Sequence, residues 1–156
     1  MRGRVLRPAD VDEVLPGLLL GSQPGRRDAK WLLRAGLTHV VDLRVDTGGS
    51  PSWPSSVTVI RYPLAEYQAP TADELDSIGA TVAQLVGEEA VVLVHCREGI
   101  QRGPLVVCAA LLHLGWPLSD AARLVRARRR LAAMSEAQLE VLRAVATRVK
   151  AATQSP

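Results

Sequence analysis

The chain has 156 residues, of which 47% are hydrophobic and 22% charged, and its formal net charge is +3 at pH 7. This length and composition are typical of one soluble globular domain with a core of its own. No apolar run reaches the roughly 18 residues that a membrane-spanning helix needs. A modest positive charge suits acidic substrates without specifying nucleic acid.

The two ends of the chain are polar and set the expected extent of the domain. Met1–Val5 is not followed by an apolar segment, so we expect no secretory signal and a cytoplasmic location. One domain is predicted over residues 1–156, with loose ends at 1–13 and 151–156.

The first half of the chain contains short apolar segments separated by polar, glycine-bearing or proline-bearing stretches. Three of these segments are predicted strands: Leu18–Leu20, Thr38–Leu43 and Val57–Tyr62. A helix is expected to open at Arg27 or Asp28 and to end at Gly36. Loops are expected at residues 46–54 and 63–70.

The middle of the chain predicts a helix and then a strand. Thr71 and Glu74 have the spacing of a capping box, which marks a helix start. An apolar stripe at helical spacing follows: Leu75, Ile78, Val82 and Leu85. The apolar run Ala90–Val94 is then predicted to be the central strand of a sheet.

Three helices are expected in the last third of the chain. Pro104–Leu114 is nearly all apolar, which predicts a helix buried against a sheet. Ser119 is the expected cap of the next helix, and Ser135 with Gln138 is the expected cap of the last. The order of elements predicts an α/β domain with a central sheet and helices on both faces.

The segment from His95 to Arg102 joins the predicted central strand to the buried helix. Backbone N–H groups of such a loop, with the positive end of the helix dipole, bind a tetrahedral dianion. The same field favours the thiolate form of Cys96. Arg102 at the end of the loop is able to hold two phosphate oxygens bidentately. The segment therefore predicts a nucleophile in a phosphate-binding loop.

Cys108 is the second of the two cysteines and follows Cys96 by twelve residues along the predicted helix. At about 1.5 Å per residue, the two would lie roughly 18 Å apart. A disulfide needs Cα atoms within about 7 Å. Cys108 is therefore expected to be a core residue, and the two free thiols fit a reducing compartment.

The motif His95-Cys96-x5-Arg102 resembles the signature loop of the cysteine-dependent protein phosphatases, and Gly99 and Ile100 match the residues usual within it. Two further segments are similar to the dual-specificity group: 15–22 to its opening strand, and 32–43 to a helix-to-strand segment. The resemblance covers roughly residues 14 to 148. It implies a phosphotyrosine phosphatase-like fold with a mostly parallel sheet.

The resemblance also implies roles for individual residues. Cys96 would attack phosphorus and form a phosphocysteine, while Arg102 and the loop N–H groups would bind the phosphate oxygens; these groups belong to Arg97, Glu98, Gly99, Ile100, Gln101 and Arg102. Neither a metal nor a cofactor is implied, because the arginine and the amides supply the positive field.

The general acid of the family is an aspartate about thirty residues before the cysteine. Here Glu66 stands thirty positions before Cys96. Asp73 is the alternative acid, although its place in the first turn of a helix also suits a capping role. A third possibility is that the chain has no dedicated acid.

Three supporting positions follow from the resemblance. Gly103 stands where the family usually has Ser or Thr, whose hydroxyl helps the thiolate leave, so slow breakdown of phosphocysteine is expected. Asp42 would tether the cysteine loop, or would be an ordinary carboxylate at a strand end. His95 would buttress the loop, or would be an ordinary core histidine.

Two other functional classes remain open from the sequence. A pseudophosphatase would bind phosphorylated partners without turnover, and Glu66 and Gly103 favour it. A rhodanese-like sulfurtransferase has a similar loop, but its loop is typically one residue shorter than the five residues between Cys96 and Arg102.

The expected substrates are phosphotyrosine and phosphoserine/threonine of proteins, or a small phosphate monoester. Arg97 and Glu98 carry opposite charges and lack the paired lysines of phosphoinositide phosphatases. The main basic patch consists of Arg123, Arg126, Arg128, Arg129 and Arg130, of which Arg123, Arg126 and Arg130 share one face of a helix. It is interpreted as a solvated helix face or, alternatively, as a patch that steers anionic substrates. No aromatic residues interleave with it, so nucleic-acid binding is not expected, nor is membrane binding. The sequence does not indicate an oligomeric state.

Overall fold

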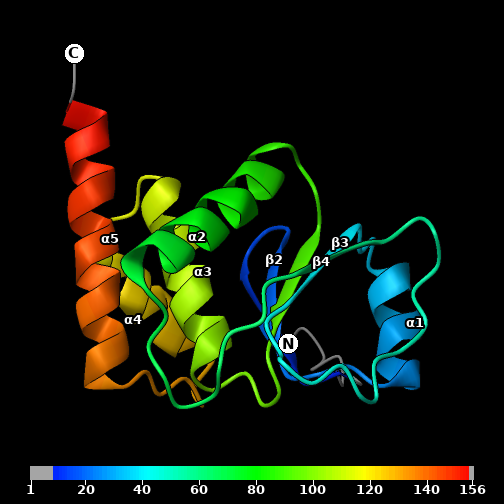
Figure 1. Cartoon of the computed structure of the whole chain (residues 1–156). Coiled ribbons are helices and arrows are strands. Elements are labelled where there is room, and N and C mark those ends of the chain that lie inside the picture. Colours follow the sequence, from blue (N-terminus) through cyan, green and yellow to red (C-terminus); the bar gives the residue numbers. More distant parts are fainter. Residues whose placement is uncertain (1–8, 155–156) are drawn as a thin grey trace, which may run out of the picture.

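The computed structural model describes residues 9–154. Its elements follow the chain in the order β1 (Val11–Leu15), β2 (Leu18–Gly21), α1 (Arg26–Arg34), β3 (His39–Asp42), β4 (Thr58–Arg61), α2 (Ala72–Gly87), β5 (Val92–His95), α3 (Arg102–His113), α4 (Leu118–Arg128) and α5 (Glu136–Gln154). They form a single small α/β domain, as the sequence predicts (Figure 1).

The five strands form one sheet in the order β1-β2-β5-β3-β4. β2, β5, β3 and β4 run parallel, and only β1 at the edge is antiparallel to its neighbour. In the register of β3 and β5, Asp42 lies opposite His95. The loops after these two strands therefore emerge side by side at one edge of the sheet, which is where parallel α/β sheets place their sites.

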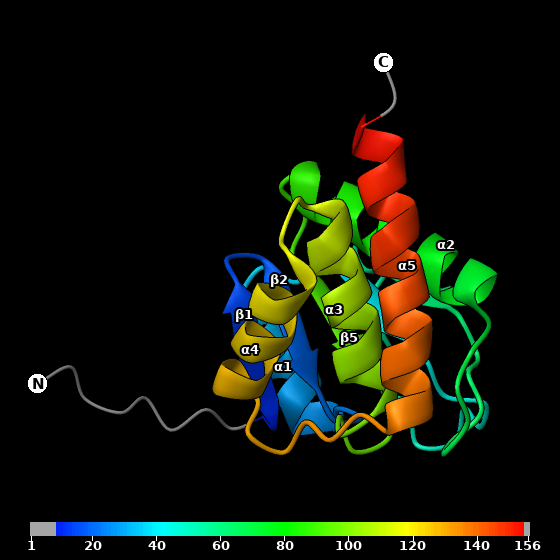
Figure 2. The same cartoon turned by 90° about the vertical axis from the view of Figure 1, so that its left-hand side faces the viewer.

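The sheet separates two apolar cores, because successive side chains of a strand point to opposite faces. Leu19 and Leu93 pack with Leu32 of α1 on one face. Leu20 and Val94 pack on the other face, with residues of the remaining helices. Figure 1 shows α1 alone on one side of the sheet, and in Figure 2 the helices α3, α4 and α5 face the viewer.

Helix α3 is the central helix of the larger layer and is buried from Arg102 to Leu112. The helix is apolar because it is buried, as its sequence predicts. Gly79 allows α2 to pack closely against α3, since a Cβ atom at this position would lie 2.7 Å from the Cβ of Ala109 on α3. Tight packing on all sides holds the first turn of α3, and hence Arg102, at the end of β5. None of the helices in the described part of the chain is long and apolar enough to cross a membrane.

The expectation of a loose N-terminal segment is wrong for residues 9–13. Val11 begins β1, which pairs with β2, and its side chain is 4% exposed. Val11 and Val14 pack on opposite faces of the sheet, and the register shifts between Glu13 and Leu15. Because β1 buries one valine on each face, its sequence lacks the alternation of apolar and polar residues that identifies a half-buried strand. Residues 1–8 lie outside the described part of the chain.

The expected tail after Lys150 is also wrong for residues 151–154, which continue α5 as far as Gln154; residues 155–156 lie outside the described part. The predicted cap at Ser119 differs as well, because α4 begins at Leu118 with Pro117 as its N-cap. The other two predicted caps are confirmed: Glu74 N–H donates to Thr71 Oγ1, and Gln138 N–H donates to Ser135 Oγ.

Candidate active site

The loop from Cys96 to Gln101 joins β5 to the first turn of α3. The Cys96 side chain is buried, and its Sγ accepts a hydrogen bond of 3.2 Å from the Gly99 N–H. Gly99 has a φ of +70°, and a Cβ atom there would lie 2.7 Å from the Gly21 carbonyl oxygen. Glycine is required at this position, because only it adopts that backbone without strain or collision. The helix N-terminus and the Gly99 N–H group both present positive partial charge to the Cys96 sulfur.

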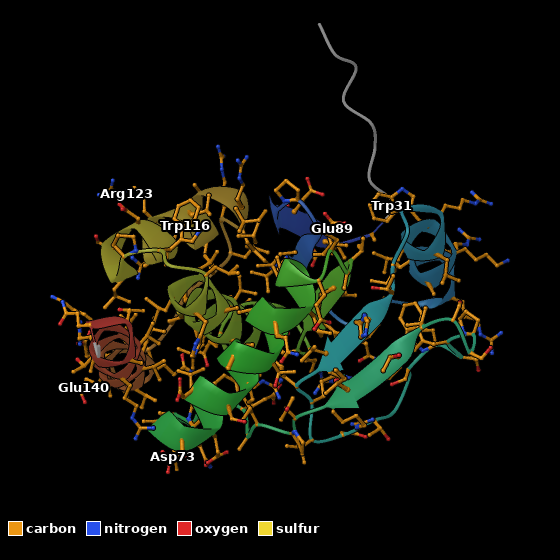
Figure 3. All side chains as sticks on the ribbon, turned by 90° about the horizontal axis from the view of Figure 1, so that it is seen from above. Trp31, Asp73, Glu89, Trp116, Arg123 and Glu140 are labelled. Carbon is orange, nitrogen blue, oxygen red and sulfur yellow. The ribbon has the colours of Figure 1, made fainter. Side chains whose placement is uncertain are left out.

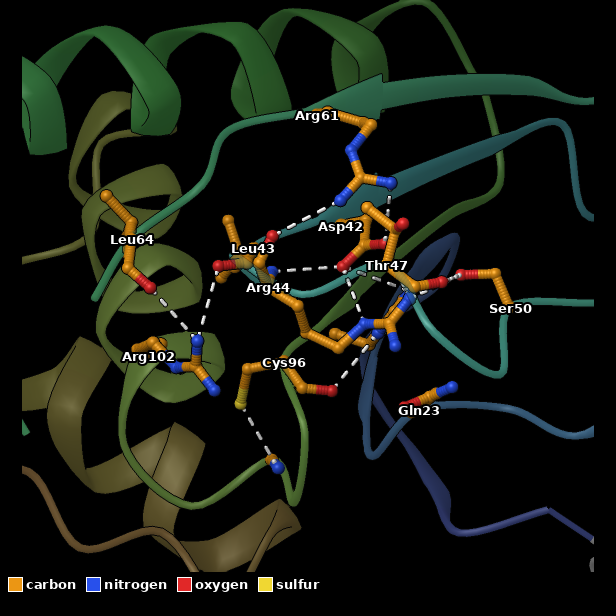
Figure 4. A network of polar contacts seen from close by, with 12 residues as sticks. Gln23, Asp42, Leu43, Arg44, Thr47, Ser50, Arg61, Leu64, Cys96 and Arg102 are labelled. Carbon is orange, nitrogen blue, oxygen red and sulfur yellow. Dashed lines mark hydrogen bonds and ion pairs between the residues drawn. The ribbon is translucent and has the colours of Figure 1, made fainter. Parts of the chain in front are cut away.

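Arg102 is the first residue of α3, and its side chain is held rigidly. One guanidinium nitrogen, Nη1, donates to the Leu64 carbonyl at 3.0 Å and to the Leu43 carbonyl at 3.4 Å, as Figure 4 shows. The other, Nη2, donates to Glu66 Oε1 at 2.9 Å. Two loops of the sheet edge therefore orient Arg102, and Glu66 occupies Nη2.

Glu66 lies in the loop between β4 and α2, and the structure brings it to Arg102 as an ion pair. Its side chain is 42% exposed. The carboxylate takes the same donor that a bound phosphate would use. Glu66 and a bound phosphate are therefore competing partners of Nη2.

Asp73, the alternative acid, lies elsewhere. It is 88% exposed in the first turn of α2, where Arg148 of α5 donates to it at 2.6 Å. Figure 3 shows Asp73 at the periphery of the molecule. Asp73 does not line either cavity at the cysteine loop.

Two cavities meet at the pair formed by Glu66 and Arg102. The cysteine cavity, of about 250 Å³, is lined by Glu66, Tyr67, Cys96, Glu98, Ile100, Gln101 and Arg102. The arginine cavity, of about 330 Å³, is lined by Gln23, Arg44, Val45, Asp46, Gly48, Ala65, Glu66, Arg97 and Arg102. Within residues 9–154, no group of three or more His, Cys, Asp or Glu side chains is arranged to hold a metal ion.

His95 and Asp42 lie at the ends of adjacent strands behind the cysteine loop. His95 Nδ1 lies 3.1 Å from the Cys96 carbonyl oxygen; since a carbonyl only accepts, Nδ1 carries the proton in this contact. Burial lowers the pKa of His95, although the charge of Asp42 opposes this effect. The neutral ring thus holds the backbone of the nucleophile, which agrees with the buttressing role expected for His95.

Asp42 contacts the side chains of Arg44, Arg61 and His95. Arg44 donates to the two carboxylate oxygens from Nε at 3.0 Å and from Nη2 at 2.9 Å (Figure 4). Burial alone would raise the pKa of Asp42, but the hydrogen bonds from Arg44 outweigh it and the pKa is lowered. Asp42 approaches the cysteine loop through His95, whose Nε2 lies 3.9 Å from Asp42 Oδ1.

Arg129 directly follows α4 and was missed as a site residue. It is 1% exposed, and it donates to the carbonyl oxygens of Gly99 at 2.7 Å and Glu98 at 2.8 Å. It also forms ion pairs of 3.0 Å with Asp10 and Asp12 of the N-terminal segment, and its hydrogen bonds lower the pKa of Asp10. Arg129 therefore connects the cysteine loop to the edge strand.

The expectation of a solvated basic face is consequently wrong for Arg129, while Arg123 remains 80% exposed at the periphery of α4 (Figure 3). In the sequence, the acidic pair Asp10 and Asp12 was the available indication that a basic residue packs against the N-terminal segment. Periodicity could not have selected the inward arginine, since α4 ends at Arg128 and the chain turns there.

Gly103 and Cys108 both lie on α3. A Cβ atom at Gly103 would lie 3.6 Å from Cys96 Sγ, so a serine hydroxyl would fall within reach of the sulfur. The same Cβ would meet Leu20 Cδ1 at 2.7 Å. Cys108 is fully buried, and burial raises the pKa of its thiol to about 12. Cys108 is therefore an inert core residue, as predicted.

Comparisons with known proteins agree with this geometry. The family model described as DSP-PTPase phosphatase fused to NAD+ kinase matches residues 12–145. Human dual specificity protein phosphatase 13B is 32% identical over 117 residues, which cover 65% of this chain and 55% of that protein. Drosophila melanogaster dual specificity protein phosphatase Mpk3 is 28% identical over 120 residues, which cover 75% of this chain and 29% of that protein. The chain thus spans about half or less of the length of these relatives.

A solved structure is similar over nearly its full length. The crystal structure of human DUSP28 superimposes with a TM-score of 0.81 at 25% identity, covering 92% of this chain and 97% of that one. Together the matches support the phosphatase interpretation of the cysteine loop over the sulfurtransferase alternative.

Proposed function

This chain belongs to the DSP-PTPase phosphatase family, and on that premise we propose that it hydrolyses phosphate monoesters through a phosphocysteine intermediate. One observation carries the proposal. Cys96 Sγ accepts the Gly99 N–H at 3.2 Å, in a loop closed by an arginine with one donor nitrogen directed to the site. That arrangement suits a thiolate facing a bound phosphate.

The reaction is proposed to proceed in two steps. In the first, the Cys96 thiolate attacks phosphorus in line, a P–S bond forms and the ester P–O bond breaks, while Glu66 donates a proton to the departing oxygen. In the second, Glu66 takes a proton from water, which attacks phosphorus and releases phosphate and the thiolate. Arg102 and the loop N–H groups stabilise the equatorial oxygens in both steps. They supply the positive charge, so no metal is proposed to be needed.

The proposed substrates are monoesters of two kinds. The relatives are named as dual specificity protein phosphatases, which supports phosphotyrosine and phosphoserine/threonine of proteins. Small phosphate esters are compatible with the same chemistry.

The test is hydrolysis of p-nitrophenyl phosphate by the purified protein in the presence of a chelator. We expect turnover that Cys96→Ser abolishes, because a serine hydroxyl in this loop remains protonated. Cys108→Ala is the matched control, since this second cysteine is buried in α3 away from the loop. Retained activity in Cys96→Ser, or loss of activity on chelation, would contradict the mechanism.

A second candidate is a module that binds phosphorylated partners without turnover. It is favoured by the glutamate at position 66 in place of the aspartate usual in the family, and by the missing hydroxyl at Gly103. The same assay separates the two candidates: phosphate binding measured by calorimetry without hydrolysis of the aryl ester would favour the binding module.

A further inference from the structure

The loop of residues 63–70, which we call the acid loop, is held at a point on each side of Glu66. Before Glu66, the Leu64 carbonyl oxygen accepts Arg102 Nη1 at 3.0 Å. After Glu66, the Gln68 carbonyl oxygen accepts Nε2 of Gln138, a residue of α5, at 3.4 Å. Glu66 lies midway between these two carbonyl groups in the chain. The direction of its side chain therefore depends on both contacts.

The acid loop contains a strained residue between the two contacts. Tyr67 directly follows Glu66 and has a φ of +58°, in the left-handed region that residues other than glycine seldom adopt. Its side chain is 83% exposed, so packing of the ring does not impose this conformation. Such a backbone persists only where the surrounding structure holds it. The contact of Gln68 with Gln138 holds the chain directly after Tyr67.

Gln138 is an unusual residue for its place in α5. The helix buries Gln138, Leu142 and Val145, whose spacing puts all three on one face. An apolar side chain would serve the packing of this face. Gln138 is nevertheless a polar residue that is 1% exposed, and burial of an amide is unfavourable unless the amide is hydrogen-bonded. Packing alone therefore does not explain a glutamine here.

The N-terminal cap of α5 explains only the oxygen of the Gln138 amide. Oε1 accepts the Ser135 N–H at 2.9 Å, and Ser135 Oγ accepts the Gln138 N–H at 3.2 Å. A glutamate would complete this capping box equally well, because the box uses only the side-chain oxygen. The nitrogen has no part in the cap, and it is the end of the amide that contacts the acid loop.

The connection between α4 and α5 also contacts the cysteine loop. The Ala133 N–H donates to the Ile100 carbonyl oxygen at 2.8 Å, and Arg129 donates to the carbonyl oxygens of Glu98 and Gly99. Gln138 follows this connection in the first turns of α5. The same part of the chain therefore holds the cysteine loop and, through Gln138, the acid loop.

Resting on the proposed function, we propose that Gln138 is a positioning residue for the general acid. Its Nε2–H fixes the Gln68 carbonyl and hence the strained backbone after Glu66, so that the carboxyl group of Glu66 reaches the leaving-group oxygen. Glutamate is one methylene longer than the aspartate usual in the family and has more rotamers to restrict. Gln138 does not line the cysteine cavity, so it acts through Glu66 and not on the substrate.

The test is the dependence of kcat/KM on the leaving group in Gln138→Met, which keeps the length of the side chain and removes the N–H donor. We expect kcat/KM for an alkyl phosphate to fall about tenfold or more, because a displaced acid protonates a poor leaving group inefficiently. For p-nitrophenyl phosphate it should change by less than about twofold, since this leaving group departs without a proton. Because kcat/KM reports only the steps up to release of the alcohol, slow breakdown of phosphocysteine does not mask the effect.

Ser135→Ala is the matched control. It removes the other hydrogen bond of the same cap and leaves the contact of Gln138 with Gln68 in place. We expect Ser135→Ala to keep the wild-type leaving-group dependence. An equal loss for both substrates in Gln138→Met would overturn the proposal, because it would show a general structural effect.

A double variant tests whether Gln138 acts through Glu66. The kcat/KM values of Glu66→Gln/Gln138→Met are expected to equal those of Glu66→Gln alone, because a positioning residue has no effect once the acid is absent. A further loss in the double variant would contradict the proposal. So would a Glu66→Gln protein with the wild-type leaving-group dependence, since Gln138 would then have no acid to position.

Gln138→Asn keeps the inference testable if Gln138→Met does not fold. Asparagine is also an amide but is one methylene shorter, so its nitrogen does not reach the Gln68 carbonyl, and the same leaving-group pattern is expected. A wild-type pattern in the folded Gln138 variants overturns the inference and leaves the proposed function intact.

Failure of the proposed function gives a different result, namely no hydrolysis of p-nitrophenyl phosphate by the wild-type protein. The hold on the acid loop is then measured as backbone amide hydrogen exchange of residues 63–70. Faster exchange in Gln138→Met than in Ser135→Ala supports the positioning contact, and equal exchange in the two variants overturns it.

Discussion

Arg102 has two partners that exclude each other: Glu66 in this structure and the phosphate in the proposed reaction. The 2.9 Å ion pair means that substrate binding must break one interaction before it forms another. Freed from Arg102, Glu66 becomes available to the leaving group. In the proposed reaction, one side chain thus both limits phosphate affinity and supplies the proton.

Glu66→Gln is expected to change two measured quantities in opposite directions. Turnover of an alkyl phosphate should fall by about a hundredfold or more, because a poor leaving group depends on proton donation, while p-nitrophenyl phosphate should be much less affected. Inhibition by inorganic phosphate should become stronger, because glutamine no longer forms an ion pair with Arg102. Steady-state kinetics with both substrates measure the two effects.

Asp73→Asn is the control for this prediction, because Asp73 is exposed and paired with Arg148 outside the site. It should leave both substrates unchanged. An equal loss for the two substrates in Glu66→Gln, or a loss confined to Asp73→Asn, would show that Glu66 is not the acid.

Gly103 predicts which step limits turnover. Without a hydroxyl beside Sγ, breakdown of phosphocysteine should be slow, and an activated aryl phosphate should give a burst of product before a slower steady rate. Gly103→Ser should raise the steady rate by about tenfold to a hundredfold, the value of roughly 1.5–3 kcal/mol for one hydrogen bond to a charged group. Rapid-mixing absorbance measurements follow both phases.

The serine needs space, because its Cβ would meet Leu20 Cδ1 at 2.7 Å. The double variant Leu20→Val/Gly103→Ser removes that methyl group, and Leu20→Val alone is its control. A wild-type trace without a burst, together with an unchanged steady rate in the double variant, would mean that another group stabilises the departing thiolate.

At the scale of elements, the turn after α4 positions the cysteine loop through Arg129. Arg129→Met removes the donors to the Glu98 and Gly99 carbonyl oxygens, so the peptide that directs the Gly99 N–H at Sγ is no longer held. We expect kcat/KM to fall at least tenfold and the free energy of unfolding to fall by roughly 1–3 kcal/mol for each carbonyl left unpaired.

Arg129→Lys separates positioning from simple stability. Lysine keeps the charge for Asp10 and Asp12 but cannot donate to both carbonyls in the same fork. It should restore stability more than activity, because kcat/KM depends on the exact position of the Gly99 N–H that faces Cys96 Sγ. Full recovery of kcat/KM in Arg129→Lys would show that Arg129 acts only through its charge.

The sequence predicts those parts of the fold whose structure is determined by residues close together in the chain. β5 and α3 are apolar because they are buried, and the Thr71 and Ser135 caps depend on residues three positions apart. The cysteine loop is predictable for the same reason, since its groups lie within eight residues.

The parts that could not be predicted depend on contacts between distant segments. β1 has an irregular register and is defined by pairing with β2, while Arg129 is indistinguishable from its neighbouring arginines until α4 is placed against β1. The Glu66–Arg102 ion pair joins residues 36 positions apart. No periodicity or spacing within the chain encodes such contacts.

At the scale of the whole molecule, His95 and Asp42 are buried behind the cysteine loop. We expect His95 to make the folded protein less stable in weak acid. The folded pKa of His95 lies below its ordinary value of 6.5, so below pH 6.5 the unfolded chain binds the proton more readily than the folded one. The stability contributed by neutral His95 is present above pH 6.5 and is lost as the pH falls toward the folded pKa. The lowered pKa of Asp42 acts only below its ordinary value of 3.8.

Urea unfolding followed by tryptophan fluorescence at several pH values between 7.5 and 4.5 measures this effect. The free energy of unfolding should decline with acidification, by at most about 1.4 kcal/mol per pH unit from one histidine. His95→Asn keeps a donor for the Cys96 carbonyl and does not titrate, so its curve should be flatter over this range. Parallel curves for the two proteins would assign the decline to other groups.

The contact between Arg129 and Asp10 spans 119 positions of the chain. When the ribosome has translated the cysteine loop, Arg129 has not yet been synthesised. The loop is held only after α4 has formed and Arg129 has paired with Asp10 and Asp12 at β1. The nascent chain therefore contains Cys96 before the loop around it is held in place. The proposed activity is expected to appear late in synthesis, after the early and late segments have packed together.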